Sequence, residues 1–287
     1  MTPRRRWPWR SAAALGLLSL VAACRPGDAP EKQSVASLPA DAASVARSDA
    51  AGIDSGEAWT TSKASLLDFL HRTYGREAKL VSPWRDGAGE AARELRVCAR
   101  RMPLADDQPE GLLAVCSQSE FGSGSIDFFQ LTTTPNGLRA IAYARNVETG
   151  ANGWSDARLV RFGARRWGFI DHGGFQAYGT LIGWDVLRAF RGGQLVEVAT
   201  IHTDFDNDGA ECRRRTDCAE TKISIESYHQ FDAADRHADA WPLVLRQRGV
   251  ECGQPLDRTL RYDFDAAGFR YPVPDGPPDE TRCAGAE

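Results

Sequence analysis

The sequence lacks the short motifs that mark the common classes of catalytic site. It contains no GxSxG nucleophile elbow, no HExxH zinc motif, no SxxK pair and no Walker phosphate loop. The run Gly122–Ser125 has the wrong order for an elbow and is typical of a flexible turn. No two cysteines are spaced CxxC, so neither a zinc ribbon nor a thioredoxin-like redox site is indicated. No catalytic residue is predicted, and a non-catalytic protein is favoured.

The chain begins with an apolar segment that is too short to span a bilayer as a mature helix. This segment, Ala12–Ala22, follows a basic stretch and runs into Val21-Ala22-Ala23-Cys24. The basic stretch contains Arg4, Arg5, Arg6 and Arg10. The order of basic segment, apolar segment and cysteine closely resembles the lipobox signal of bacterial lipoproteins.

The resemblance implies that residues 1–23 are a signal peptide and that Cys24 becomes the acylated first residue of the mature protein. Palmitate and further acyl chains on Cys24 would hold the protein on the membrane, since each buried methylene contributes about 0.8 kcal/mol. In enteric lipoproteins an aspartate after this cysteine marks retention at the inner membrane. Arg25 stands there instead, which favours the outer membrane and a domain that faces the periplasm. The alternative is an ordinary secretory signal cleaved near Cys24.

The charge of the mature chain argues against nucleic acid as a partner. The signal takes four of the 35 basic residues and none of the 39 acidic residues, so the mature net charge is −8. A protein this acidic repels nucleic acid and anionic lipid surfaces. The expected partners are the membrane, through the lipid anchor, and a protein or envelope polymer.

Composition divides the mature chain into a tether and one domain. Residues 24–58 are dominated by Ala, Ser, Asp and Pro, a composition that cannot bury enough surface to order itself. Residues 59–287 show neither an internal repeat nor a break in composition, so a single β-rich globular domain is predicted there.

The domain is predicted to be mainly β, an antiparallel meander forming a barrel or a sandwich, with one α-helix at its start. Ser62–Tyr74 has helical periodicity and ends at Gly75. Short β-patterned runs separated by turn residues follow. The expected strands are Leu95–Met102, Leu112–Gln118, Ile126–Thr133, Leu138–Val147, Arg158–Phe162, Trp167–His172, Thr180–Phe190, Leu195–Thr203, Lys222–Phe231, Leu243–Arg248, Arg258–Phe264 and Phe269–Tyr271. Of these, Thr180–Phe190 has a short helix as its alternative.

A two-residue turn at Gly192-Gly193 allows the register of one hairpin to be predicted. The predicted cross-strand pairs are Arg188–Glu197, Phe190–Leu195 and Trp184–Ile201. One opposite-charge pair and two apolar pairs are what cross-strand pairing favours.

Six cysteines besides Cys24 predict three disulfides in an exported protein. If residues 103–111 form a hairpin loop, Cys98 lies opposite Cys116 and the two can be linked. Cys212 and Cys218 are close in sequence, which favours their pairing. Elimination leaves Cys252 and Cys283, whose bond would hold a proline-rich tail.

The only specific chemistry in the sequence is the acidic run Asp204-x-Asp206-x-Asp208-Gly209, which predicts a structural Ca²⁺ site. The run is similar to the calcium loops of EF-hands and of FG-GAP-type propeller blades. It departs from both, because Arg215 stands where an EF-hand has its bidentate glutamate, and Cys212 where the FG-GAP loop ends in aspartate. The alternative is a solvated acidic turn.

Other polar residues give weaker indications. Arg213–Arg215 can receive an anion, although a solvated cluster that offsets the neighbouring aspartates is favoured. The Asp171-His172 pair and His202 with Asp204 can contribute to metal sites, but half-exposed strand histidines are the commoner case. The tryptophans are interpreted as core and strand-face residues.

The favoured function is a non-catalytic, lipid-anchored cell-envelope domain that binds a partner protein, an envelope polymer or a small ligand. One alternative is an envelope hydrolase of the glycosidase type, for which a pocket with two carboxylates about 5–10 Å apart would be the mark. Another is a lipid-binding half-barrel, which would need an apolar cavity lined by the concave face of the sheet.

Overall fold

The computed structural model describes residues 56–87, 93–102, 110–118, 124–149, 155–211, 218–274 and 283. All of them belong to one unit of the chain, Ala50–Glu287. The predicted signal peptide, Cys24, Arg213–Arg215 and Cys212 lie outside these residues. Within the described ranges no helix is both long enough and apolar enough to cross a membrane.

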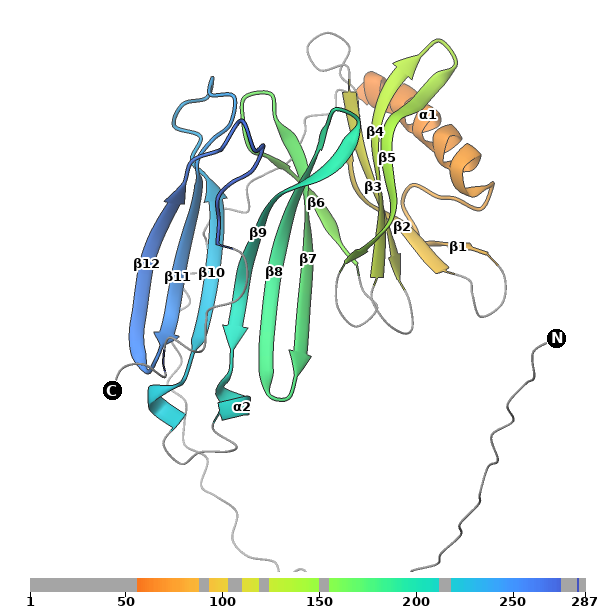
Figure 1. Ribbon diagram of the computed structural model, residues 1–287. Helices are drawn as coiled ribbons and strands as arrows, with labels where there is room; N and C mark the ends of the chain where they lie inside the picture. Colours follow the sequence, from red (N-terminus) through yellow and green to blue (C-terminus); the bar gives the residue numbers. More distant parts are fainter. Residues whose placement is uncertain are drawn as a thin grey trace, which may run out of the picture. The chain divides into compact units, whose positions relative to one another are not determined.

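The domain is mainly β and antiparallel, as predicted, and its strands form two sheets (Figure 1). The five-stranded sheet contains β1 (Trp84–Asp86), β2 (Arg93–Arg101), β3 (Glu110–Gln118), β4 (Gly124–Thr134) and β5 (Gly137–Thr149). The seven-stranded sheet contains β6 (Ala157–Arg161), β7 (Trp167–Ala177), β8 (Thr180–Arg191), β9 (Gln194–Asp206), β10 (Ser224–Phe231), β11 (Leu243–Glu251) and β12 (Gln254–Tyr262). Within each sheet every strand pairs with its neighbours in the chain, which confirms the meander.

The helix α1 (Gly56–Tyr74) covers one face of the five-stranded sheet (Figure 1). It begins six residues before the predicted start and ends where predicted, because Gly75 adopts a positive φ of 90° that glycine tolerates. Leu66 and Leu70 are buried in an apolar cluster with Phe129 of β4. The apolar face that defined the helix in the sequence is therefore the face that makes this core.

The opposite face of the five-stranded sheet packs against the seven-stranded sheet. Ala114, Ile126 and Phe128 meet Phe169 of β7 in one buried cluster. The rings of Phe128 and Phe169 lie 4.9 Å apart. Two faces packed in this way make a sandwich, one of the two architectures that the strand pattern allowed.

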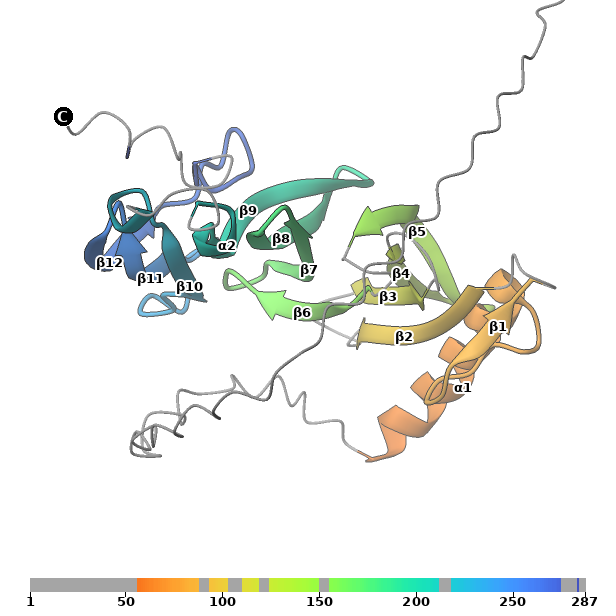
Figure 2. The same ribbon diagram turned by 90° about the horizontal axis from the view of Figure 1, so that it is seen from below.

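The other face of the seven-stranded sheet carries a second core, which is completed by the end of the chain. β9 and β10 are paired only at residues 204–206 and 224–226. Beyond these residues, the backbone N–H of Tyr271 donates to Val198 on β9 over 2.8 Å. The prediction of a strand at Phe269–Tyr271 is wrong. This segment belongs to a loop with one isolated bridge, between Asp265 and Arg270. The rings of Phe269 and Tyr271 are buried in the second core. Figure 2 shows the same strands from below.

The β8–β9 hairpin confirms two of the three predicted pairs and corrects the third. Arg188 lies opposite Glu197 and Phe190 opposite Leu195, as the Gly192-Gly193 turn requires. Trp184 lies opposite His202 instead of Ile201, because an extra residue on β9, Val198, forms a bulge that shifts the register by one. Thr180–Phe190 is a strand and not the alternative helix.

Two of the three predicted disulfides fall within the described residues, and both are confirmed. Cys98–Cys116 forms with a Cα–Cα distance of 5.8 Å, although Arg96 and not Cys98 is the backbone partner of Cys116. Cys98 sits in a bulge between Val97 and Ala99, which brings its side chain towards the partner strand. Cys252–Cys283 links the turn between β11 and β12 to the tail. Cys212–Cys218 stays a prediction.

Candidate functional site

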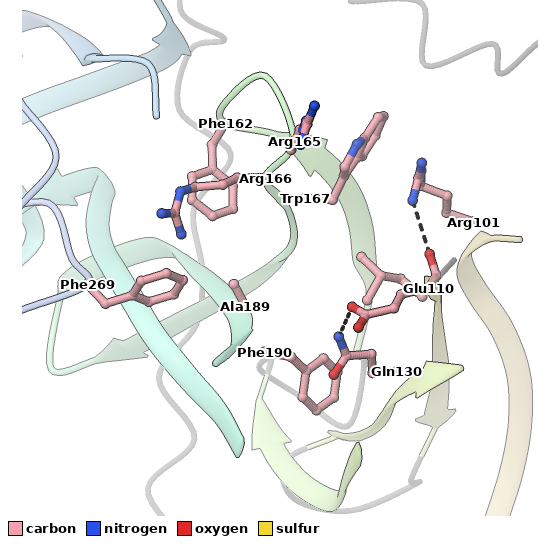
Figure 3. Close-up of a pocket in the computed structure, with 11 residues that line it drawn as sticks. Arg101, Glu110, Gln130, Phe162, Arg165, Arg166, Trp167, Ala189, Phe190 and Phe269 are labelled. Atoms are coloured by element: carbon pink, nitrogen blue, oxygen red, sulfur yellow. Dashed lines mark hydrogen bonds between the residues drawn. The ribbon is translucent and has the colours of Figure 1, made fainter. Parts of the chain in front are cut away.

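A cleft of about 310 Å³ lies where the two sheets and the end of the chain meet. Figure 3 shows eleven residues that line it. Arg101, Glu110 and Gln130 come from β2, β3 and β4. Arg165 and Arg166 come from the turn between β6 and β7, and Trp167 is the first residue of β7. Phe190 on β8 and Phe269 near the end of the chain complete the apolar part of the wall. The residues come from segments far apart in the sequence, and only the fold brings them together.

The turn between β6 and β7, which carries Arg165 and Arg166 and leads into Trp167, is held by backbone hydrogen bonds. The N–H of Ala164 donates to Ala238 over 2.8 Å, and that of Trp241 donates to Phe162 over 2.7 Å. Gly163 lies so close to the facing segment that an added Cβ would be 1.9 Å from the carbonyl oxygen of Asp239. The position therefore requires glycine, and the turn is fixed against the chain that follows β10.

Stacking on aromatic rings fixes the arginines of the cleft. The guanidinium of Arg101 lies 4.7 Å from the centre of the Trp167 ring. That of Arg166 lies 5.1 Å from the ring of Phe264 and 4.9 Å from that of Phe269. Such stacking is worth about 0.5–2 kcal/mol per pair, and it removes rotamer freedom that a ligand would otherwise have to remove.

The cleft is rich in hydrogen-bond donors and poor in acceptors. Its one carboxylate, Glu110, accepts a hydrogen bond from the amide of Gln130 (Figure 3). Arg166 pairs with Asp239, yet its buried Nε has no acceptor among the described residues. The buried indole Nε1 of Trp167 has none there either. The exposed Arg165 forms no ion pair or hydrogen bond with any residue that the structure describes.

A second polar cluster lies on the seven-stranded sheet, outside the cleft. The buried carboxylate of Asp185 on β8 contacts His172 Nδ1 on β7 over 2.9 Å and His229 Nε2 on β10 over 2.7 Å. Arg158 on β6 lies 3.6 Å from the same carboxylate. The cluster ties together four strands, including the pair β8 and β10, which share no backbone hydrogen bonds.

Two neighbouring aspartates of this sheet have opposite pKa shifts. Asp171 faces the five-stranded sheet, where burial raises its pKa although Arg188 and Thr149 donate to it. At Asp185 burial also acts upwards, but the hydrogen bonds from His229 and His172 outweigh it and lower the pKa. Asp171 bonds to Thr149 and Arg188 and His172 to Asp185, so these neighbours point to opposite faces of the sheet and do not combine in one site.

The acidic run Asp204–Asp208 spans the end of β9, where β9 pairs with β10, and the start of the short helix α2 (Asp208–Glu211). Asp206 accepts hydrogen bonds from the backbone N–H of Asp208 and from the hydroxyl of Ser224. Asp208 pairs with Lys222 over 3.1 Å, and Asp204 lies over Gly183 on the next strand. Among the described residues the three carboxylates do not gather within 4.8 Å of one another. Calcium binding here stays a prediction.

One group of possible metal ligands does gather within the described ranges. It comprises Cys98, Cys116 and Asp156, with ligand atoms within 4.8 Å of one another. Both cysteines are joined in the disulfide, so the group offers no thiolate. We assign no metal to it.

Sequence reasoning did not find the cleft or the cluster around Asp185. The sequence predicts Trp167 as a strand-face residue and His172 as a strand histidine, and both lie on β7. Neither prediction indicates that Trp167 stacks with Arg101 or that His172 contacts Asp185. One signal was present for the cleft, the consecutive Arg165 and Arg166 directly before a tryptophan. No protein-family model, no curated protein and no solved structure matches this chain.

Proposed function

We propose that this protein is a lipid-anchored domain of the bacterial cell envelope that binds a ligand in the cleft without catalysing a reaction. The observation that carries the proposal is the cleft itself, where fixed arginines and aromatic rings surround about 310 Å³. This volume is at the lower end of the about 300–1,000 Å³ usual for small-molecule sites. A few polar groups set among apolar walls are also typical of such sites.

The lining residues favour binding over the two alternatives from the sequence. A glycosidase site needs two carboxylates, whereas Glu110 is the one carboxylate among the residues that line this cleft. A lipid carrier needs an apolar cavity against the sheet. The second face of the seven-stranded sheet is instead packed with side chains such as Leu187, Ile201 and Tyr271.

A fragment screen with a blocked variant tests the proposal. We expect small aromatic fragments, both neutral and charged, to shift the indole N–H signal of Trp167 in ¹H–¹⁵N spectra. Gln130→Trp places a large side chain in the cleft and should abolish these shifts, while an unchanged melting temperature would show that the fold is kept. If no fragment binds wild type at the cleft, the proposed function is wrong.

The anchor is tested separately by fractionation. Cys24→Ser removes the thiol that would carry the acyl chains, so the variant should leave the membrane fraction or accumulate with its signal uncleaved. Washing membranes with high salt controls for electrostatic association. A variant that fractionates as wild type does would contradict the anchored location but not the binding function.

A structural Ca²⁺ at Asp204, Asp206 and Asp208 is a further part of the proposal. The support is the spacing of the three carboxylates and the glycine after them, at the end of a hairpin.

A further inference from the structure

We infer that the cleft recognises an anionic group, a carboxylate or a phosphate, on a small ligand. This inference rests on the proposed binding function and names the chemistry of the ligand. It starts from the charges that face the cleft: the guanidinium groups of Arg101, Arg165 and Arg166 against the single carboxylate of Glu110. In a mature chain with a net charge of −8, three cations around one cleft are a local reversal of sign.

Existing ion pairs leave part of this positive charge available. Asp239 contacts Arg166 through one terminal nitrogen and is 71% exposed, so the pair is weakened by solvent. The Arg101 side chain donates to the backbone oxygen of Glu110 over 3.2 Å. Arg165 has no counter-ion among the described residues.

Two buried donors strengthen the same conclusion. Trp167 Nε1 and Arg166 Nε can only donate, and neither meets an acceptor within the described part of the chain. A buried donor without an acceptor costs about 1–3 kcal/mol of stability. An oxyanion has several lone pairs and can accept hydrogen bonds from more than one donor at once.

The donors belong to side chains that are already held in place. Arg101 stacks on the Trp167 ring, and Arg166 stacks on Phe264 and Phe269. Figure 3 shows Trp167 with Arg165 beside it and Arg101 on its other side. A planar guanidinium held by stacking can present two parallel N–H groups to a carboxylate or a phosphate. The rings of Phe190 and Phe269 leave apolar surface for the body of the ligand.

Titration with two simple anions tests the inference. Inorganic phosphate and succinate are added at constant ionic strength, and the indole N–H signal of Trp167, assigned with Trp167→Phe, is followed. We expect one or both anions to shift this signal with saturation. Arg165→Gln should weaken the binding about tenfold or more, because it removes a charge-assisted hydrogen bond. Arg76→Gln is the matched control, since Arg76 is also exposed and lies outside the cleft.

The outcomes separate the inference from the proposed function. Saturation by phosphate alone, or by succinate alone, supports the inference and decides between the two headgroups. If neutral fragments bind the cleft while neither anion does, the inference is wrong and the binding function stands. If neither anions nor fragments bind, both are wrong. Equal weakening by Arg165→Gln and Arg76→Gln would mean that only the overall charge matters, and would also overturn the inference.

Discussion

In two regions of the domain an arginine stacks on an aromatic ring. The regions differ in whether the nearby hydrogen-bond donors have an acceptor within the protein. Between α1 and the five-stranded sheet, Arg145 lies 5.2 Å from the ring of Tyr74. Its Nε and the Tyr74 hydroxyl both donate to Asp127, over 3.1 and 2.7 Å. The backbone N–H of Asn146 donates to the same carboxylate over 2.7 Å. In the cleft Arg101 stacks on Trp167 in the same way, but no described carboxylate receives the indole N–H.

The difference separates a structural site from a binding site. Asp127 is only 4% exposed, and its carboxylate is shared by three donors, which is how a buried charge is kept in a fold. Burial, with the nearby Asp127 carboxylate, holds the pKa of Tyr74 far above its usual value, so the hydroxyl stays protonated and donating. The cleft has the same residue types and lacks the internal acceptor, so we expect an acceptor from outside the chain.

The largest effect should come from removing the internal acceptor. Asp127→Ala leaves the Tyr74 hydroxyl and the Asn146 N–H without a partner, and should lower the free energy of unfolding by about 2–4 kcal/mol. Asp127→Asn, which keeps one acceptor oxygen, should cost less. Urea unfolding measures both. Glu110→Ala in the cleft should change stability by no more than about 0.5 kcal/mol, because Glu110 is exposed. Equal losses for Asp127→Ala and Glu110→Ala would remove the distinction between the regions.

A smaller loss of stability should follow from a substitution that displaces the turn between β6 and β7 but leaves the donors of the cleft in the sequence. Gly163→Ala places a methyl group against the carbonyl of Asp239 and should cost about 1–3 kcal/mol. It should also weaken phosphate binding, since the turn that carries Arg165 and leads into Trp167 must move. Asp127→Ala, measured well below its melting temperature, should leave phosphate binding within about twofold of wild type. Loss of binding in Asp127→Ala would show that the two regions are coupled.

The pH dependence of stability should separate the two aspartates of the seven-stranded sheet. The pKa of Asp185 is lowered from 3.8, so its contribution is present above that pH and is lost as the pH falls through the folded-state pKa. The pKa of Asp171 is raised from 3.8, so its contribution is full below that pH and is lost as the pH rises through the folded-state pKa.

Slopes of stability between pH 7 and about pH 3 test these signs. Asp185→Asn should flatten the loss of stability on acidification, because it removes a group that must be protonated against its hydrogen bonds. Asp171→Asn should steepen that loss, because it removes a group whose protonation favours the fold. Chemical denaturation across this pH range gives the slopes. The same change of slope in both variants would contradict the opposite shifts.

The smallest expected effect concerns calcium. An ion that binds only the folded state adds RT ln(1 + [L]/Kd), and exported loops often bind with a Kd of about 10⁻⁴–10⁻³ M. Millimolar calcium should then add only about 1 kcal/mol, or a few degrees of melting temperature. Asp206→Asn should reduce this gain and leave stability in chelator equal or higher. If wild type melts at the same temperature in calcium and in chelator, the loop is a solvated acidic turn.

Local patterns predicted much of the fold, and the failures have local causes. Alternation and turn residues located all but the three-residue β1, which is too short to show a period. The Gly192-Gly193 turn predicted the register only as far as the Val198 bulge, since a bulge has no marker in the sequence. Phe269–Tyr271 has a strand's composition, but its rings are used to fill a core.

The candidate site was much less predictable than the fold. Arg101 and Trp167 are far apart in sequence, and their stacking depends on how two sheets pack. The same holds for Asp185, whose two histidine partners come from different strands. The sequence indicated the acidic run because its three aspartates lie within five residues of one another. Sites assembled from several strands leave no comparable spacing to read.

The most direct test is a pair of crystal structures, one grown in phosphate and one in a neutral buffer without small anions. We expect phosphate in the cleft, with its oxygens within about 3.2 Å of Trp167 Nε1 and of the Arg165 guanidinium. In the second crystal neither donor should meet an acceptor of the protein, with Trp167 Nε1 buried and the Arg165 guanidinium in solvent. If both crystals instead show these donors bonded to acceptors of the protein itself, the cleft is a structural site like that of Asp127, and the binding function proposed for it is contradicted.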